Sequence, residues 1–455
     1  MTFKTSLTFM LVACMAGCAT YHPLKLDDKS ALATSVSHLT VDSHTLPFQF
    51  LSAHRFDPSD GLDMTEVAML AVSNNPNLRL ARDDANISHA QAFSAGLLPD
   101  PQLSLSRDFP RPSTPGATNA FNAGLGYDFG SLVTHAASSS AARFDSRKTD
   151  LNLLWQEWQV VAQARLLFSR AIAEENLLRW LTESRNLLAE GYAKSKAALD
   201  EGNLASNAVN LALSAWQDSS KRVSDLERQQ LQTRNDLNAL LGLAPETKLK
   251  LVEEEVLGTP DEKEIDQALA DLSSRRPDLL ALKAGYSAED ARYRQAILAQ
   301  FPPFNLAITS ARDTAGLFTH GFALSLALPL LNGNRGNIKI EEATRQRLHD
   351  EYKIRLDTAY AGVKRLVTDS RLIAAQLQTA EIGLKAFDKT TSNAKLALAD
   401  GELDVNSYAA FQSSRIAKHV EVGNFQQALL ENRIALLALL GGNFDIQSIV
   451  TESHQ

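Results

Sequence analysis

Apolar residues recur at three- and four-residue steps along positions 142–199, the spacing of a helix that buries one stripe of its surface. The members of this stripe include Leu151, Leu154, Trp158, Val161, Phe168 and Ile172. A helix of that length would be about 87 Å long, far beyond the usual helix of a compact domain. The chain then reverses at 199–203, and a second helix ends near Gly242. The pattern therefore predicts a very long helical hairpin.

The same order of sequence features occurs in both halves of the chain. Arg275-Arg276-Pro277 follows Asn74-Asn75-Pro76 by 201 positions, and Gly401 follows Gly202 by 199 positions. A second apolar stripe runs through about 337–398 and contains Leu356, Tyr360, Val363, Val367, Ala374, Leu377 and Leu384. Because several landmarks share nearly one offset, we interpret the chain as a tandem duplication.

Two pairs of segments change the period from helical to alternating, which predicts strands. These segments are 102–106 and 120–130 in the first half, and 304–311 and 321–331 in the second half. Their apolar positions alternate with small or polar ones, which fits lipid on one side and water on the other. The predicted lipid-facing residues are Phe121, Leu125, Tyr127, Phe129, Phe322, Leu324, Leu326 and Leu328.

The first residues are typical of an export signal. Lys4 precedes a short apolar run, and Met15-Ala16-Gly17 leads to Cys18, as in a bacterial lipobox. We therefore expect residues 1–17 to be removed and Cys18 to carry a covalent lipid. The alternative is an ordinary cleaved signal with an incidental cysteine. Cys14 is the only other cysteine, so no disulfide is expected in the mature chain.

These patterns divide the chain into six segments. They are a lipoprotein signal peptide at 1–17, a lipidated N-terminal linker at 18–60, a first repeat at 61–242, a linker at 243–263, a second repeat at 264–442 and a C-terminal tail at 443–455. Each repeat is expected to hold a helix, two strands and a long helical hairpin.

Composition excludes several functions. The net charge is −8 and no segment carries a dense stripe of Lys and Arg, which argues against nucleic-acid binding. The sequence contains no His-Glu-x-x-His motif, no phosphate-binding glycine loop and no Gly-x-Ser-x-Gly motif. We therefore predict neither an enzyme nor a metal site, and no cofactor apart from the lipid on Cys18.

Four strands cannot close a barrel, and an open edge in lipid leaves backbone groups unpaired at several kcal/mol each. If the strands enter a membrane, several chains must share one barrel. The alternative is a soluble four-stranded sheet that packs its apolar face on helices.

The arrangement resembles the outer-membrane factors of TolC type. The resemblance rests on the duplication, on the glycine-containing hairpin turns, on Leu97-Leu98-Pro99-Asp100-Pro101 and on 328–337. The last two segments are most similar to the heavy-metal-efflux branch. The sequence Asp128-Phe129-Gly130-Ser131-Leu132 departs from that branch, where a Gly-Lys-Arg turn is frequent.

This resemblance implies a mainly α fold with a membrane β-barrel portion: a homotrimer whose hairpins form an α-barrel tunnel above a shared 12-stranded barrel. It also implies a passive exit duct of a tripartite efflux system, anchored in the outer membrane, with a periplasmic adaptor and an inner-membrane pump of the resistance-nodulation-division type. The alternatives are a lipid-anchored periplasmic coiled-coil scaffold without a pore and a type I secretion duct. A hairpin adaptor fits less well, because adaptors usually have one hairpin and a lipoyl-like domain.

The resemblance places the helical reversals at the periplasmic aperture, where they would meet the adaptor. The predicted residues are Asp200, Glu201, Gly202, Asn203, Asp400, Gly401, Glu402 and Asp404. Repeated threefold, the acids would favour cations. The alternative is that they are merely solvated loop residues. Gly202 and Gly401 are expected to supply the positive φ that a tight reversal needs.

Overall fold

The computed structural model describes residues 21–111, 116–253, 257–258 and 260–441. The first half contains two short 3-10 turns, η1 (Val36–His38) and η2 (Ser43–Thr45), followed by α2 (Gln49–Ser52), α3 (Met64–Asn74), α4 (Pro76–Gly96), β1 (Gln102–Asp108), β2 (Ala120–Asp128), α5 (Phe129–Asp200) and α6 (Ser206–Leu240). The second half contains α7 (Glu262–Ala270), α8 (Leu272–Arg275), α9 (Pro277–Leu298), β3 (Phe304–Arg312), β4 (Phe318–Leu326), α10 (Arg335–Ala399) and α11 (Val405–Leu440).

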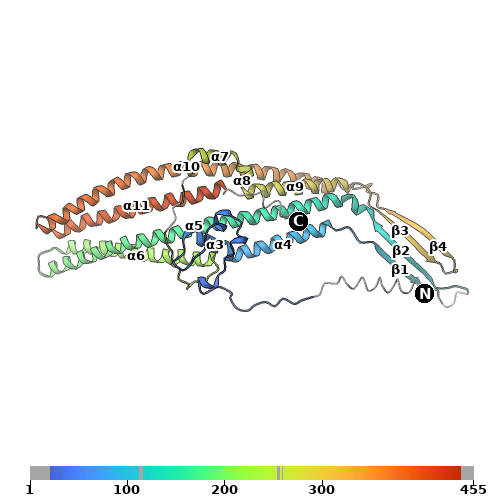
Figure 1. Ribbon diagram of the computed structural model, residues 1–455, viewed down its shortest axis with the longest axis horizontal. Coiled ribbons are helices and arrows are strands. Elements are labelled where there is room, and N and C mark those ends of the chain that lie inside the picture. Colours follow the sequence, from blue (N-terminus) through green and yellow to red (C-terminus); the bar gives the residue numbers. More distant parts are fainter. Residues whose placement is uncertain (1–20, 112–115, 254–256, 259, 442–455) are drawn as a thin grey trace.

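The molecule is elongated, with the strands at one end and both helical reversals at the other (Figure 1). Helix α5 has 72 residues and is therefore about 108 Å long. Helix α10 has 65 residues and is about 98 Å long. Each long helix packs along two shorter ones, α5 beside α4 and α6, and α10 beside α9 and α11. Helices α9 and α11 also pack on α5, which joins the two halves.

Each pair of shorter helices meets end to end at a hydrogen-bonded junction. In the first half, the Asn75 side chain accepts bonds from the first backbone N–H groups of α4, and its Nδ2 donates to the carbonyl of Leu240, 2.9 Å away. In the second half, Arg276 Nη1 donates to the carbonyl of Leu439, also at 2.9 Å. Both side chains are buried. The junctions thus satisfy carbonyls that the ends of α6 and α11 would otherwise leave unpaired.

The N-terminal segment differs from the extended linker predicted for it. Leu46, Phe48 and Leu51 are buried, and the ring of Phe48 lies 5.3 Å from that of Trp158 on α5. The segment between the repeats also pairs with the first half, through parallel bridges from Ala33 to Leu243 and from Leu62 to Leu251. Isolated apolar residues without a period therefore anchor both segments.

The four strands form one antiparallel sheet in the order β1-β2-β3-β4. The inner pair joins the repeats, with Leu125 opposite Ile308 and Tyr127 opposite Leu306. Within the described chain, β1 and β4 are the edges of this sheet.

Two predicted strand boundaries are wrong. Phe129 is the first residue of α5, because the Asp128 carboxylate accepts hydrogen bonds from Gly130 N and Ser131 N and so caps the helix. Leu328 lies beyond β4, which ends at Leu326, and the following Pro329 has no N–H to continue the ladder. Neither residue can therefore belong to a strand face.

The long helices extend beyond the predicted arms, α5 by 13 residues at its start. Helix α5 begins before position 142, and α10 covers 335–399. None of the helices in the described residues combines the length and apolar character needed to cross a membrane.

We predict that Asn75→Ala lowers the free energy of unfolding by about 1–3 kcal/mol, because it leaves the buried carbonyl of Leu240 unpaired. Thermal unfolding of the purified protein in detergent checks this. The matched control is Asn77→Ala, two residues further along α4, where the side chain is exposed. Equal melting temperatures for the two variants would contradict the role of the junction.

Candidate functional site

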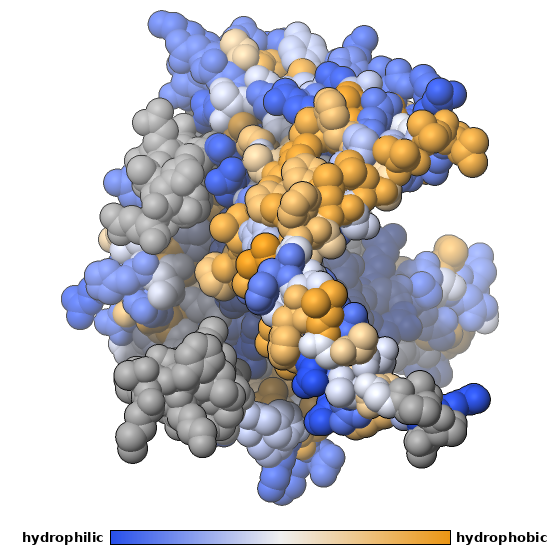
Figure 2. All heavy atoms as spheres, turned by 90° about the vertical axis from the view of Figure 1, so that its right-hand side faces the viewer, coloured by the Kyte–Doolittle hydropathy of each residue, from blue (hydrophilic) through white to orange (hydrophobic). Residues whose placement is uncertain are grey.

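The pairing register gathers the apolar strand residues on one face of the sheet. Leu103, Leu125, Ile308 and Phe322 form one row across all four strands, and Tyr127, Leu306 and Leu324 form the next. The opposite face holds small and polar residues, including Ser104, Asn122, Gly124, Gly126, Ala307, Thr309, Gly321 and Ser325. Phe322 is 79% exposed, which is unusual for a phenylalanine in a sheet. Figure 2 shows apolar side chains gathered at the strand end of the molecule.

The predicted lipid-facing residues Phe121, Leu125, Tyr127, Phe322, Leu324 and Leu326 all lie on this face, hereafter the apolar sheet face. Leu103, Leu105, Leu306 and Ile308 belong to it as well, although they were not among the predicted residues. The register between strands shows that they share a face with the predicted residues. Their contact with lipid stays a prediction.

The row nearest the strand loops is amphipathic. It places Arg107, Phe121, Arg312 and Phe318 side by side. The Arg312 guanidinium lies 5.5 Å from the centre of the Phe318 ring, and the rings of Phe121 and Phe318 are 6.1 Å apart. Aromatic and long basic side chains of this kind suit a boundary between apolar and aqueous surroundings.

The two helical reversals have nearly the same geometry. Helix α5 ends at Asp200, and Gly202 follows with φ of 78°; in the second half, Gly401 has φ of 76°. Asn203 N donates to the carbonyl of Ala198, and Glu402 N donates to that of Ala397. This is the glycine-terminated helix end that the sequence predicts, and a side chain at either glycine would be strained.

The structure brings the predicted aperture residues together at one end of the molecule, and all of them are exposed. Asp404 has a local role as well, because its carboxylate accepts hydrogen bonds from Ser407 N at 3.0 Å and Ser407 Oγ at 2.6 Å at the start of α11. The predicted contact of these residues with an adaptor is untested. Cys18, the predicted lipid site, lies outside the described residues.

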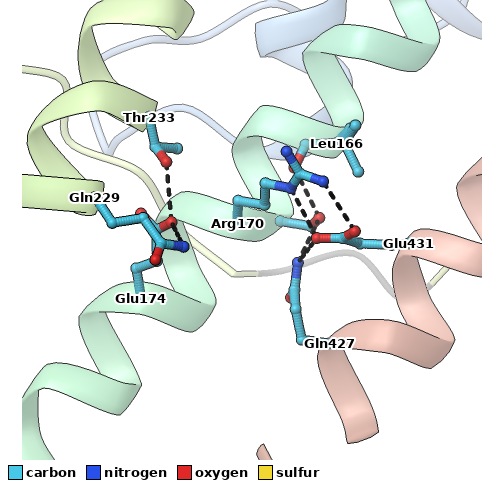
Figure 3. Close-up of polar contacts among 8 residues, drawn as sticks. Leu166, Arg170, Glu174, Gln229, Thr233, Gln427 and Glu431 are labelled. Carbon is cyan, nitrogen blue, oxygen red and sulfur yellow. Dashed lines mark hydrogen bonds and ion pairs between the residues drawn. The ribbon is translucent and has the colours of Figure 1, made fainter. Parts of the chain in front are cut away.

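A polar cluster between the two hairpins was not among the predicted sites. Arg170 on α5 forms a bidentate ion pair with Glu431 on α11, with Nε and Nη2 lying 2.8 and 3.0 Å from the carboxylate oxygens (Figure 3). Gln427 donates to the same carboxylate at 2.8 Å. On the other side, Glu174 accepts hydrogen bonds from Gln229 and Thr233 of α6, both at 2.9 Å. The cluster therefore links α5, α6 and α11.

The two acids of this cluster titrate differently. Burial raises the pKa of Glu174, although hydrogen bonds from Thr233 and Gln229 and the charge of Arg170 act against it. Burial also acts to raise the pKa of Glu431, but hydrogen bonds from Arg170 and Gln427 outweigh it and lower the pKa overall. Glu431 is thus the carboxylate that Arg170 holds ionised.

A second buried acid lies nearer the sheet. Glu289 on α9 is only 3% exposed. Burial, followed by a hydrogen bond and charge repulsion from Glu341 on α10, raises its pKa to about 7, although Arg292 at 3.3 Å acts against the shift. Arg292 also forms an ion pair with Asp145 on α5. The carboxyl group of Glu289 therefore gains its charge near neutral pH.

Comparison with known proteins supports one family. Residues 268–442 match the family model described as outer membrane efflux protein. The chain is 30% identical over 241 residues to outer membrane protein OprJ of Pseudomonas aeruginosa, which covers 48% of each chain. It is 23% identical over 180 residues to the probable outer membrane lipoprotein SilC of Salmonella typhimurium, covering 37% of this chain and 39% of SilC. These matches span less than half the length of each relative.

Among solved structures, the Campylobacter jejuni CmeC outer membrane channel superposes with a TM-score of 0.71 at 14% identity, covering 96% of this chain and 98% of CmeC. The likeness extends over the whole mainly helical fold with its small sheet. The match to the outer membrane efflux protein family thus covers the second half of the chain, and the fold of the whole chain is that of the CmeC channel. The resemblance and the chain-level fold inferred from the sequence are therefore confirmed, whereas the proposed branch of the family stays a prediction.

We predict that Glu289→Gln changes the pH dependence of stability. The pKa of Glu289 in the folded protein is above its ordinary value, so the stability that its protonated form contributes is present at low pH and is lost as pH rises through about 7. At pH 8 the variant should be more stable than wild type by about 1–2 kcal/mol, and at pH 5 the two should be nearly equal.

Melting curves at both pH values provide the measurement. Glu342→Gln is the matched control, because Glu342 is exposed and pairs with Lys339 on its own helix. A Glu289→Gln variant with the same advantage at pH 5 and pH 8 would contradict the raised pKa.

Proposed function

We propose that this protein is the outer-membrane channel component of a tripartite efflux system, a passive exit duct without catalytic activity. The observation that carries the proposal is the four-stranded sheet, which has one apolar face and two edge strands, β1 and β4, without partners in the described chain. Attached helices about 100 Å long continue the wall away from the sheet.

The open edges favour a closed assembly of several copies. An unpaired strand edge in lipid costs several kcal/mol for each backbone group, so β4 of one copy should pair with β1 of the next. Three copies would give a 12-stranded barrel, the homotrimer that the family resemblance implies. Strands β2, β3 and β4 have nine residues each, which is within the range of about 9–11 residues expected of a strand that crosses a bilayer.

In this arrangement the strands lie in the outer membrane and the helical hairpins extend into the periplasm. The exposed acids at the two reversals then surround the far opening, where a periplasmic adaptor and an inner-membrane pump, expected to be of the resistance-nodulation-division type, would meet it. The relative SilC is described as a lipoprotein, which supports a lipid on Cys18 and anchoring in the outer membrane.

Two alternatives predict different behaviour. A pore-free periplasmic scaffold would leave the apolar sheet face in water, which large exposed residues such as Phe322 disfavour. A type I secretion duct would share the architecture and differ in its cargo and inner-membrane partner.

We predict that Phe322→Lys lowers the yield of outer-membrane trimer severalfold, because a lysine on the lipid face costs about 2–4 kcal/mol near the bilayer midplane. Ala323→Lys is the matched control. It lies next to Phe322 on the opposite face of β4, so it should assemble normally and alter conductance instead. Native mass in detergent and single-channel recording provide the readouts. A stable water-soluble monomer, or equal assembly of both variants, would refute the barrel.

We also predict that the double variant Asp400→Lys, Glu402→Lys lowers the cation-over-anion permeability ratio severalfold while trimers persist, because it reverses the charge at the opening. Reversal potentials in a salt gradient measure the ratio. Asp225→Lys, a charge change on the exposed surface of α6, serves as control. Loss of trimers would instead indicate a structural role for the reversal.

A further inference from the structure

One arginine lies between two acids where the two hairpins meet. Arg170 belongs to α5 of the first hairpin, and its present partner Glu431 belongs to α11 of the second. Glu174 follows Arg170 by four positions on α5, the spacing at which two helix residues can form an ion pair. The single cation thus has one acceptor across the hairpin boundary and another on its own helix.

The second acceptor is incompletely used. Glu174 Oε1 accepts hydrogen bonds from Gln229 and Thr233, whereas Oε2 is buried and has no hydrogen-bond partner among the described residues. The residue is only 5% exposed. A buried carboxylate oxygen without a hydrogen-bond partner is destabilising. The present arrangement therefore satisfies Glu431 and leaves Glu174 under-satisfied.

The space around Arg170 would allow its side chain to move. A cavity of about 970 Å³ lies along this boundary, lined by residues of α5, α6 and α11 that include Arg170, Glu174 and Glu431. At the cavity's other end, the ring of Trp180 on α5 stacks on His419 of α11, with centroids 4.0 Å apart. On the side of the helix junctions, Ile434 of α11 packs in the apolar core with Phe168 of α5; along the cavity, the contacts between the hairpins include the Arg170–Glu431 pair and the Trp180–His419 stack.

We propose that Arg170 is an exchangeable clasp between the two hairpins. Bound to Glu431, it holds α11 against α5. When α11 moves away, Arg170 turns to the free oxygen of Glu174, so that neither the cation nor this acid is left buried without a partner. The exchange lowers the free-energy cost of parting the hairpins. The proposal rests on the proposed function in one respect, namely that the parted arrangement is the wider state of the duct.

The clasp predicts opposite effects for two isosteric substitutions. Glu431→Gln weakens the closed pairing and should increase the population with parted hairpins roughly threefold or more. Glu174→Gln removes the receiving charge and should decrease that population by a similar factor. In an Arg170→Met background the two substitutions should no longer shift the population in opposite directions, because neither acid can then pair with Arg170.

The test uses full-length protein in lipid nanodiscs, with spin labels at Lys196→Cys on α5 and Ser414→Cys on α11. Cys14 and Cys18 are the only native cysteines, so the protein without added cysteines shows the background labelling. Pulsed electron–electron distances report the populations, and single-channel conductance in planar bilayers reports the duct. Asp225→Asn is the matched control, because Asp225 pairs with Lys221 and Arg228 within α6 alone.

Opposite shifts in the distance distribution support the clasp. Shifts in the same direction, or no shift for Glu174→Gln, overturn the exchange and leave Arg170–Glu431 as a fixed link. Melting curves and native mass exclude variants that fail to fold. If the distances shift as expected but the protein never conducts, the clasp proposal stands and the proposed duct function is contradicted.

Discussion

The architecture depends on how short helices are joined beside long ones. Helix α5 runs uninterrupted, whereas its neighbours α4 and α6 meet end to end, and α9 and α11 do the same beside α10. Helix ends leave carbonyl and N–H groups unpaired, and burying them costs free energy unless a side chain bonds to them. Asn75 in the first repeat and Arg276 in the second meet this requirement, each bonding to the last turn of the returning helix. Different chemistry at equivalent positions thus preserves one junction.

The two ends of the molecule on either side of this junction differ in the surfaces that they expose. Toward one end, the chain presents a sheet that is apolar on one face and small or polar on the other, with both edges open. Toward the other end, the hairpins reverse through exposed acidic turns. Between them, the hairpins share an apolar core that includes Ile434 of α11, and polar contacts such as Arg170–Glu431 lie beside it along a cavity.

Much of the local structure followed from sequence pattern. The helical period, the alternation in the strands and the glycine at each reversal are local properties, and the nearly constant offset between repeats identified the duplication. Local signals failed where two elements meet. Asp128 caps α5, which moved Phe129 from strand to helix, and Pro329 follows the end of β4, which excluded Leu328. The buried Phe48 was also missed, because a short apolar segment without a period reveals no partner.

The sequence by itself determined which segments are helix, strand and reversal, because those depend on residues a few positions apart. It also determined that one chain has too few strands to close a barrel. Only the tertiary structure decided that Arg170 pairs with Glu431, 261 positions away, and that Glu174 keeps an unpaired oxygen beside them. It likewise decided that Glu289 is buried near Glu341, with a pKa of about 7. The physical reason is that such contacts depend on how the two hairpins and the shorter helices lie against one another, which no local period records.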